Sequence, residues 1–271
     1  MDLAEPLVAS WKAQLALGFE ARGARTVLAS RRYDGPLVVQ KALHPEGEGV
    51  CHAIVVHPPG GIAGGDEIAL DAAVGPGAHA LLTTPGAGKW YRSAGPAARQ
   101  ALAFDVAGIL EWLPRESIVF DGARAALHST LRLAGAGRYI GWEIACLGRS
   151  GSGERFTRGE LRLGASVTRD GKLLWRERGR VEGAGALMRS PAGLAGHAVF
   201  GTLVATIDSI EPELLAACRE QCAVTRLPGL LVARHLGDSS EEAFERFTRI
   251  WTLLRPAIAG RDAAPPRIWS T

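Results

Sequence analysis

The chain has 271 residues, a formal net charge of +3, 47% apolar residues and 22% charged residues. A globular chain of this length buries enough surface to fold without disulfides or a structural metal. So small a net charge gives no reason to expect a nucleic-acid partner. The uncharged stretch over residues 72–88 contains two prolines and several glycines, which exclude a membrane-spanning helix there.

The N-terminal segment and the cysteines bear on the cellular compartment. Residues 1–5 lack the basic and apolar regions of a secretory signal peptide. The four cysteines include no C-x-x-C pair, and we expect them to be buried thiols rather than metal ligands. They are Cys51, Cys146, Cys218 and Cys222. We therefore expect a cytoplasmic protein.

The first two thirds of the chain consist of short runs with strand character. Residues 11–20 alternate apolar side chains with polar or small ones, which is the period of a half-buried strand. Further strands are predicted over residues 25–33, 36–43, 50–56, 66–74, 78–84, 100–106, 109–113, 117–120, 123–133, 139–147, 158–168 and 172–181. Asp34-Gly35, Asp121-Gly122 and Asp170-Gly171 predict tight turns between strands, and we expect a meander.

Only the last quarter is predicted to contain helices. A first helix is expected from Asp208 or Ser209 to about residue 223, followed by a strand over residues 227–236. A second helix opens at Ser239 with Glu242 three residues later, as in a capping box, and we expect Pro256 and Gly260 to end it. The chain is thus predicted to be a mainly β protein, with residues 1–271 forming a single domain.

The second predicted helix has a strongly apolar face, formed by Phe244, Phe247, Trp251 and Leu254 at helical spacing. This face either packs on the β layer or docks another protein. The extended tail places Trp269 at the surface unless another element covers it. Phe244, Phe247, Trp251 and Trp269 are therefore the candidates for partner docking.

The familiar catalytic motifs are absent from the sequence. Gly86-Ala87-Gly88-Lys89 resembles a phosphate loop, but a Walker A motif needs glycine at position 83 and a hydroxyl residue at position 90, where this chain has Thr83 and Trp90. Neither H-E-x-x-H nor G-x-S-x-G occurs. We expect a protein that is not an enzyme. A small-molecule enzyme that binds phosphate or nucleotide at its glycine-rich loops stays open as the alternative.

Several acidic residues lie in apolar, aromatic or glycine-rich surroundings, where a carboxylate is costly to bury. Such a group must be paired with arginine, meet water in a cavity, or have a raised pKa. Oxygen ligands of this kind bind a divalent cation weakly enough to release it, whereas firm nickel binding favours histidine or thiolate. The residues concerned are Asp66, Glu111, Asp121, Glu143 and Glu177.

Six segments in order resemble the urease accessory proteins of the UreD (UreH) family. They are HPPGGIAGGD (57–66), LTTPGAGKWYRS (82–93), EWLPRESIVFDG (111–122), GWE (141–143), GERF (153–156) and PRIW (266–269). The resemblance implies a non-catalytic scaffold with a long, helical-like stack of short strands and two α-helices near the C-terminus. It also implies binding to urease apoprotein together with a UreF-like helical protein and, through that protein, a UreG-like GTPase.

The same resemblance implies that nickel passes through an internal tunnel, with no cofactor bound permanently. By motif position, Asp66, Glu143 and Glu177 become the candidate tunnel acids. The residues expected to shape the neighbouring loop are Thr83, Thr84, Lys89, Tyr91 and Arg92. A purely structural docking protein, with its acids held in salt bridges, stays open beside the tunnel hypothesis.

Overall fold

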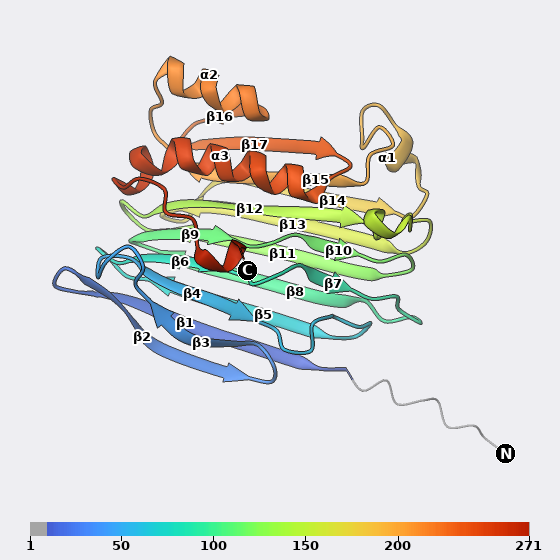
Figure 1. Ribbon diagram of the computed structural model, residues 1–271, viewed down its shortest axis with the longest axis horizontal. Helices are drawn as coiled ribbons and strands as arrows, with labels where there is room; N and C mark the ends of the chain where they lie inside the picture. The colour runs from blue at the N-terminus through green and yellow to red at the C-terminus, as the bar shows by residue number, and fades with distance from the viewer. Residues whose placement is uncertain (1–9, 271) are drawn as a thin grey trace.

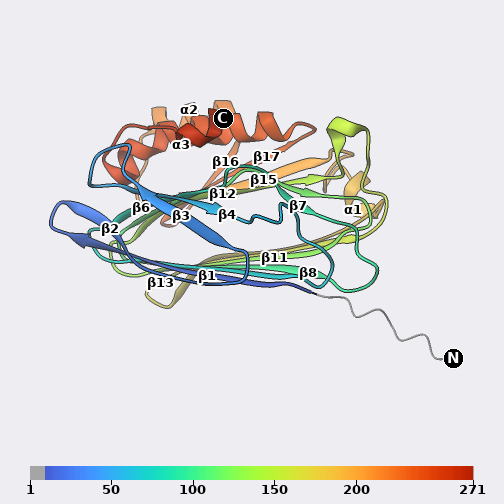
Figure 2. The ribbon, with the colours of Figure 1, turned by 60° about the horizontal axis from the view of Figure 1, so that its bottom comes forward.

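The chain folds into two facing β-sheets, with two helices near the C-terminus on the outer side of one sheet (Figures 1 and 2). The computed structural model describes residues 10–270. The segment 1–5, on which part of the compartment expectation depends, lies outside them. This architecture confirms the mainly β prediction and the two helices near the C-terminus.

The seven-stranded sheet has the order β14-β13-β11-β8-β5-β1-β2. Its strands are β1 (Lys12–Arg22), β2 (Arg25–Asp34), β5 (Glu67–Val74), β8 (Ala98–Val106), β11 (Arg124–Leu133), β13 (Glu160–Arg169) and β14 (Lys172–Glu182). The predicted alternation in β1 is confirmed, because Ala13, Leu15, Leu17 and Phe19 are buried, whereas Trp11 precedes the strand and is 54% exposed.

The ten-stranded sheet has the order β16-β17-β15-β12-β9-β6-β4-β3, and two short strands attach beside this path. Its strands are β3 (Val38–Leu43), β4 (Cys51–Val56), β6 (His79–Thr83), β7 (Gly88–Trp90), β9 (Ile109–Leu113), β10 (Ser117–Val119), β12 (Arg138–Leu147), β15 (Val199–Thr206), β16 (Ala223–Leu227) and β17 (Leu230–Gly237).

Between β4 and β13 the chain alternates between the two sheets, so neighbouring strands within each sheet run parallel. This is the helical-like stack that the resemblance implies, and it corrects the expected meander. Asp34-Gly35 and Asp121-Gly122 lie in connections between the sheets, and only Asp170-Gly171 closes a hairpin, with positive φ at both residues. Apolar periodicity identifies the buried face of a strand, but it does not reveal the direction of its neighbour.

The last third differs from the prediction at its boundaries. β15, β16 and the short helix α1 (Ala186–Arg189) were not predicted there, and neither was β7 earlier in the chain. Pro228-Gly229 forms the turn between β16 and β17 rather than preceding a single strand. Helix α2 (Pro212–Gln221) begins later than predicted, and its N-cap Glu211 makes no side-chain cap, so the expected cap at Asp208 or Ser209 is wrong.

Connections at the two ends of the sandwich differ in length. At one end the turns are short, over residues 75–78, 107–108 and 134–137. The other end carries the loops 57–66, 84–97, 114–123, 148–159 and 183–198, which we call the long-loop end. Figure 1 shows β7 and β10 within these loops. Four of the six sequence segments that carry the family resemblance extend into this end. Long loops on a rigid scaffold are common sites of function.

Helix α3 (Ser240–Ala259) covers the outer face of the ten-stranded sheet (Figure 2). Its N-cap Ser239 accepts a hydrogen bond from the Glu242 amide at 3.1 Å, which confirms that half of the predicted capping box. Pro256 is accommodated inside the helix, and Gly260 ends it in the left-handed conformation. Within residues 10–270, no helix is both long and apolar enough to cross a membrane.

The candidate docking residues lie in the chain's own aromatic cluster. Phe244, Phe247 and Trp251 are buried between α3 and the sheet. Trp269, in the short 3₁₀ helix η2 (Arg267–Ser270), packs edge-to-face on Phe244 with ring centroids 5.0 Å apart, and its indole N–H donates to Thr83. Packing on the β layer therefore accounts for this face, and a partner that docks on α3 would contact its outer side.

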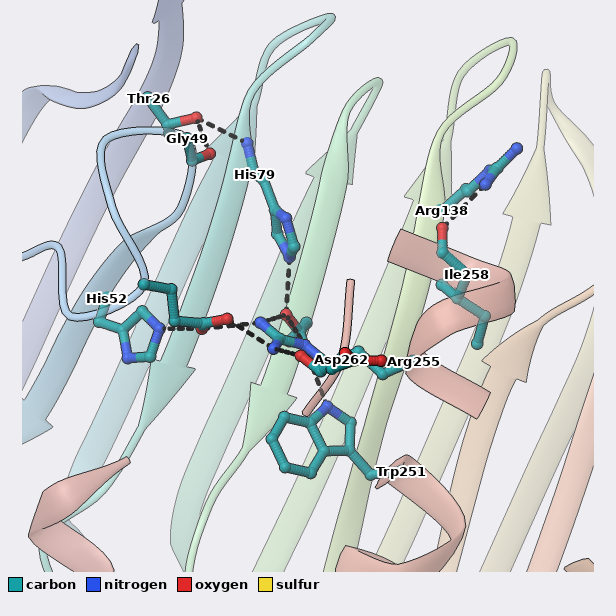
Figure 3. Close-up of polar contacts among 11 residues, drawn as sticks. Thr26, Gly49, His52, His79, Arg138, Trp251, Arg255, Ile258 and Asp262 are labelled. Carbon is teal, nitrogen blue, oxygen red and sulfur yellow. Dashed lines mark hydrogen bonds and ion pairs between the residues drawn. The ribbon is translucent and has the colours of Figure 1, made fainter. Parts of the chain in front are cut away.

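A buried network of charged side chains fastens α3 to the sheet (Figure 3). The guanidinium of Arg255 is fully buried and lies 3.0 Å from Glu111 on β9 and 2.6 Å from Glu46 in the β3–β4 turn. His79 Nε2 lies 2.6 Å from Glu111, and His52 Nε2 lies 2.6 Å from Glu46. The network joins four segments that are far apart in sequence.

The two carboxylates of this network are held in their charged form. Burial acts to raise the pKa of Glu111, but hydrogen bonds from His79 and Arg255 outweigh it and keep that pKa below its ordinary value. For Glu46 the same balance lowers the pKa to about 2, through burial opposed by His52 and Arg255. Of the five acids that the sequence singled out, Glu111 is therefore a structural ion-pair partner.

Replacing Arg255 with methionine should destabilise the chain strongly, because it leaves Glu111 and Glu46 buried without their shared cation. We expect a loss of about 3–5 kcal/mol in the unfolding free energy, measured by urea titration. Arg249→Met, which removes an exposed partner of Glu245 on the same helix, is the matched control and should cost less than about 1 kcal/mol. Equal losses in the two variants would contradict a stabilising role for the network.

Candidate functional site

A cavity of about 140 Å³ lies between the two sheets, near β11, β12, β13, β14 and β15. Apolar side chains form much of its wall, among them Phe104, Tyr139 and Trp175. Glycine and other small residues, including Gly179 and Gly201, line this part of the space between the sheets. The cavity is thus an exception in a densely packed interior.

A row of polar side chains runs along one wall of the cavity. In the ten-stranded sheet, Glu143 on β12 pairs in register with Thr202 on β15, which pairs with Arg234 on β17. Arg234 Nη1 donates to Thr202 Oγ1 at 3.0 Å and to Glu177 Oε1, on β14 of the facing sheet, at 2.6 Å. The row therefore leads from the interior to an ion pair that bridges the two sheets.

Glu143 is the most unusual member of this row, because it forms no ion pair within residues 10–270. Trp112 Nε1 donates a hydrogen bond to its Oε1 at 2.7 Å. Glu143 is half-buried as a residue, and it lines the cavity. Burial raises the pKa of Glu143 to about 7, and the Trp112 hydrogen bond opposes this effect only in part. The side chain therefore changes its charge near neutral pH.

Glu177 and Arg234 lie at the mouth of the cavity. Their side chains are 34% and 45% exposed. A larger hollow of about 820 Å³ adjoins the cavity here and shares Glu177, Thr202 and Arg234 with it. The ion pair thus lies where the smaller cavity meets the larger hollow.

The third candidate tunnel acid, Asp66, lies at the long-loop end and does not line the cavity. Its two carboxylate oxygens accept hydrogen bonds from the backbone N–H groups of Trp11 and Ala63, each at 2.8 Å. These bonds fix the path of loop 57–66. The structure therefore brings Glu143 and Glu177 to one cavity and places Asp66 elsewhere.

Asp121 has a similar role in the loops. It accepts hydrogen bonds from the backbone N–H groups of Thr157 and Arg158 at 2.7 and 2.8 Å. These bonds outweigh the effect of burial and lower the pKa of Asp121 to about 2. The carboxylate thus ties loop 114–123 to loop 148–159.

The five loop-shaping candidates are at the end of β6 and in loop 84–97. Thr83 Oγ1 donates to the Leu113 carbonyl at 2.6 Å, and Thr84 Oγ1 accepts from the Arg115 amide at 2.9 Å. Lys89, Tyr91 and Arg92 are exposed. Because the segment around Lys89 forms β7 and no helix follows it, the backbone geometry of a phosphate loop is not present there.

Sequence reasoning missed Thr202, Arg234 and Trp112. Arg234 carried a signal, since it is a charged residue inside the apolar run over residues 230–236. Thr202 and Trp112 carried none, because their roles depend on strand register between distant segments. Three of the four cysteines, all except Cys222, are buried as expected.

The chemistry of the polar row is that of oxygen ligands. Glu143 and Glu177 offer carboxylates and Thr202 offers a hydroxyl, all of which suit transient contact with a divalent cation. Within residues 10–270, no three His, Cys, Asp or Glu side chains lie close enough together to hold a metal ion. A cation in this cavity would meet its ligands one or two at a time.

Comparison with known proteins gives a consistent result over nearly the whole chain. The family model described as UreD urease accessory protein matches residues 12–270. Relatives named urease accessory protein UreD include that of Azoarcus sp. (strain BH72), 58% identical over 96% of this chain and 94% of its own. That of Dechloromonas aromatica (strain RCB) is 53% identical over 97% and 95%, and that of Pseudomonas aeruginosa (strain PAO1) is 50% identical over 97% and 96%.

Glu143→Gln should stabilise the chain at alkaline pH. The pKa of Glu143 is about 7 in the folded chain against an ordinary value of 4.5, so between these values the folded state binds more protons than the unfolded state. The stability that this group contributes therefore falls as pH rises through that interval. We expect the variant to be more stable than wild type by roughly 1–3 kcal/mol at about pH 8, and equal to it near pH 4.5, by urea titration.

Glu182→Gln, which removes an exposed carboxylate at the end of β14, is the control for this experiment and should change stability by less than about 1 kcal/mol. A Glu143→Gln variant that is less stable than wild type at about pH 8 would contradict the assignment of Glu143 as an unpaired buried acid.

Proposed function

The chain belongs to the UreD urease accessory protein family and acts in urease maturation, and we propose that it passes Ni²⁺ through the cavity between its sheets to urease apoprotein. Nickel is cargo in this proposal and not a resident cofactor. The observation that carries the proposal is Glu143, a buried carboxylate that has, within residues 10–270, one hydrogen-bond donor and no cationic partner.

An unpaired carboxylate at this position lowers stability at neutral pH, and an apolar residue would fill the space better. In this proposal the Glu143 carboxylate serves as a transient ligand for a passing cation. Protonated, Glu143 is neutral and the empty cavity holds no isolated charge. When a divalent cation arrives, it displaces the proton, and the carboxylate then compensates the charge of the metal. The proton exchange lets the cavity take up and release a charge without a permanent binding site.

The ion pair at the mouth controls access in the same proposal. Arg234 holds Glu177 at 2.6 Å through its guanidinium. A cation that crosses the mouth must take Glu177 from Arg234. Arg234 keeps its hydrogen bond to Thr202, so it has a second partner while Glu177 contacts the metal.

We propose the following partners and setting for this activity. The chain is a non-catalytic adaptor in the cytoplasm, and it binds urease apoprotein together with a UreF-like helical protein. That helical protein connects it to a UreG-like GTPase, which supplies the nickel. Family membership supports this arrangement, and the outer side of α3 is the helical surface that stays free after the apolar side packs on the sheet.

Glu143→Gln should reduce nickel loading of urease several-fold while the complex still assembles. Because this substitution is expected to stabilise the fold, a loss of loading would not reflect misfolding. The measurement is the nickel content and the activity of urease after co-expression with the variant and the other accessory proteins, with Glu182→Gln as the control. Normal nickel content with Glu143→Gln would leave an adaptor role without the passage.

Nickel transfer should also depend on pH through the same group. Below its pKa of about 7 Glu143 is protonated, and the proton competes with the metal for the carboxylate. Transfer by the wild-type chain should therefore decline as pH falls through this value. Glu143→Gln should show a flatter profile. The measurement is the rate of urease activation in a purified system. Parallel profiles for both chains would contradict proton exchange at Glu143.

A further inference from the structure

We propose that the long-loop end of the chain docks an acidic surface of urease apoprotein. The surface in question, which we call the basic–aromatic face, is formed by residues of loops 84–97, 114–123 and 148–159. Its members are Lys89, Tyr91, Arg92, Phe120, Arg149, Arg155 and Arg158. The assignment of urease as the occupant depends on the proposed function, whereas the existence and the charge of the face do not.

An exposed aromatic side chain is held in a fixed position at the centre of this face. Tyr91 is 40% exposed, and its ring covers Gly61 so closely that a Cβ atom there would lie 2.1 Å from the ring. Phe120 packs against Tyr91 edge-to-face, with centroids 5.2 Å apart. The guanidinium of Arg149 lies 4.8 Å from the Phe120 centroid. Glycine at position 61 therefore lets three side chains stack into one rigid layer.

Such a layer has the composition and rigidity of a binding hot spot. Tyrosine and arginine are enriched among the residues that dominate protein interfaces. A side chain that is already ordered loses little conformational entropy when a partner binds. Burial of Tyr91 in the chain's own core does not explain this arrangement, because the ring stays exposed.

The acidic side chains at this end are mostly turned inward, whereas the basic ones are exposed to solvent. Its carboxylates bind loop backbone and neighbouring guanidinium groups: Asp121 accepts from two amides of loop 148–159, and Glu154 accepts from the Asp121 amide at 3.3 Å and pairs with the Arg149 guanidinium at 3.0 Å. The side chains of Asp121 and Glu154 are only 11% and 21% exposed.

The cations at this end, in contrast, are exposed. Lys89, Arg92 and Arg155 form no ion pair within the described part of the chain, and Arg158, which pairs with Asp121 at 3.3 Å, is still 68% exposed. The surface therefore presents a surplus of positive charge around a rigid aromatic centre. Complementarity requires an acidic partner. The small net charge of the whole chain and the stacked, protein-like hot spot favour a protein over a nucleic acid.

The position of this face relative to the cavity favours urease as the protein that docks there. Loop 183–198 belongs to the same end, and its Leu187 and Leu194 line the outer hollow that adjoins Glu177 and Arg234. A protein seated on the long-loop end would therefore lie beside the mouth of the cavity. A receiver of metal must cover such an opening, since an ion released to solvent is lost by diffusion.

The test measures binding of the chain, purified with its helical partner, to immobilised urease apoprotein without nickel. The double variant Lys89→Glu, Arg92→Glu should raise the dissociation constant at least about tenfold, mainly by slowing association. It should also reduce the dependence of binding on salt concentration. Tyr91→Ala should weaken binding chiefly by faster dissociation. Arg176→Glu, Arg178→Glu on the exposed side of β14 is the matched control and should leave binding within about twofold.

Thermal unfolding of each variant checks that these exposed substitutions leave the fold intact. Unchanged binding by the Lys89/Arg92 variant, or an equal loss in the β14 control, would overturn the proposal. A Lys89/Arg92 variant that binds urease normally but loses binding to the helical partner would also overturn it. Because nickel takes no part in this assay, normal nickel loading with Glu143→Gln would refute the passage and leave the docking face standing.

Discussion

Two β-sheets packed face to face enclose a layer about 10 Å thick, and the rest of this structure depends on how that layer is filled. Apolar side chains from both sheets occupy most of it. A carboxylate is tolerated at such depth only with a partner or with room for water. The chain contains both solutions, one on each face of the ten-stranded sheet. Glu111, under α3, has Arg255 and His79 as partners, whereas Glu143, between the sheets, has the Trp112 indole and a cavity.

The surroundings of these two glutamates distinguish them more clearly than their sequence context does. Both lie in apolar strands with a neighbouring tryptophan, and both belong to segments that carry the family resemblance. Their pKa values move in opposite directions, because hydrogen bonds and ion pairs exceed the effect of burial at Glu111 and do not at Glu143. A chain that can place an arginine beside one buried acid and leaves another unpaired accepts a cost in stability at the second. Such a cost is typical of functional sites.

The sequence predicted the strands well and their arrangement only in part. Alternation revealed the buried face of β1, and the lone charge in the strand around Glu143 pointed to an exceptional site. Pairing direction, the crossovers between sheets and the partnership of Arg234 with Glu177 depend on contacts between segments far apart in the chain, which local periodicity does not encode. Periodicity predicted the apolar face of α3, as it predicted the buried face of β1. The pattern did not show which element would cover that face of α3. The motif around Asp66 marked a loop that the carboxylate holds in shape, so a motif residue is not by itself a ligand.

The unequal ends of the sandwich connect these observations. Because each parallel crossover returns the chain to the same end, the long loops collect at one side of the molecule and the tight turns at the other (Figure 1). Insertions at the long-loop end change no strand register, so this end can acquire an exposed, rigid surface while the interlayer packing stays intact. The cavity opens at the edge of the sandwich, where β14 faces β17 and where loop 183–198 borders the outer hollow. A partner on the loops and a cation at Glu177 would therefore be neighbours although their binding residues belong to separate parts of the sequence. The same strand topology that places Glu143 between the sheets thus also gathers the long loops at one end, beside the opening of the cavity.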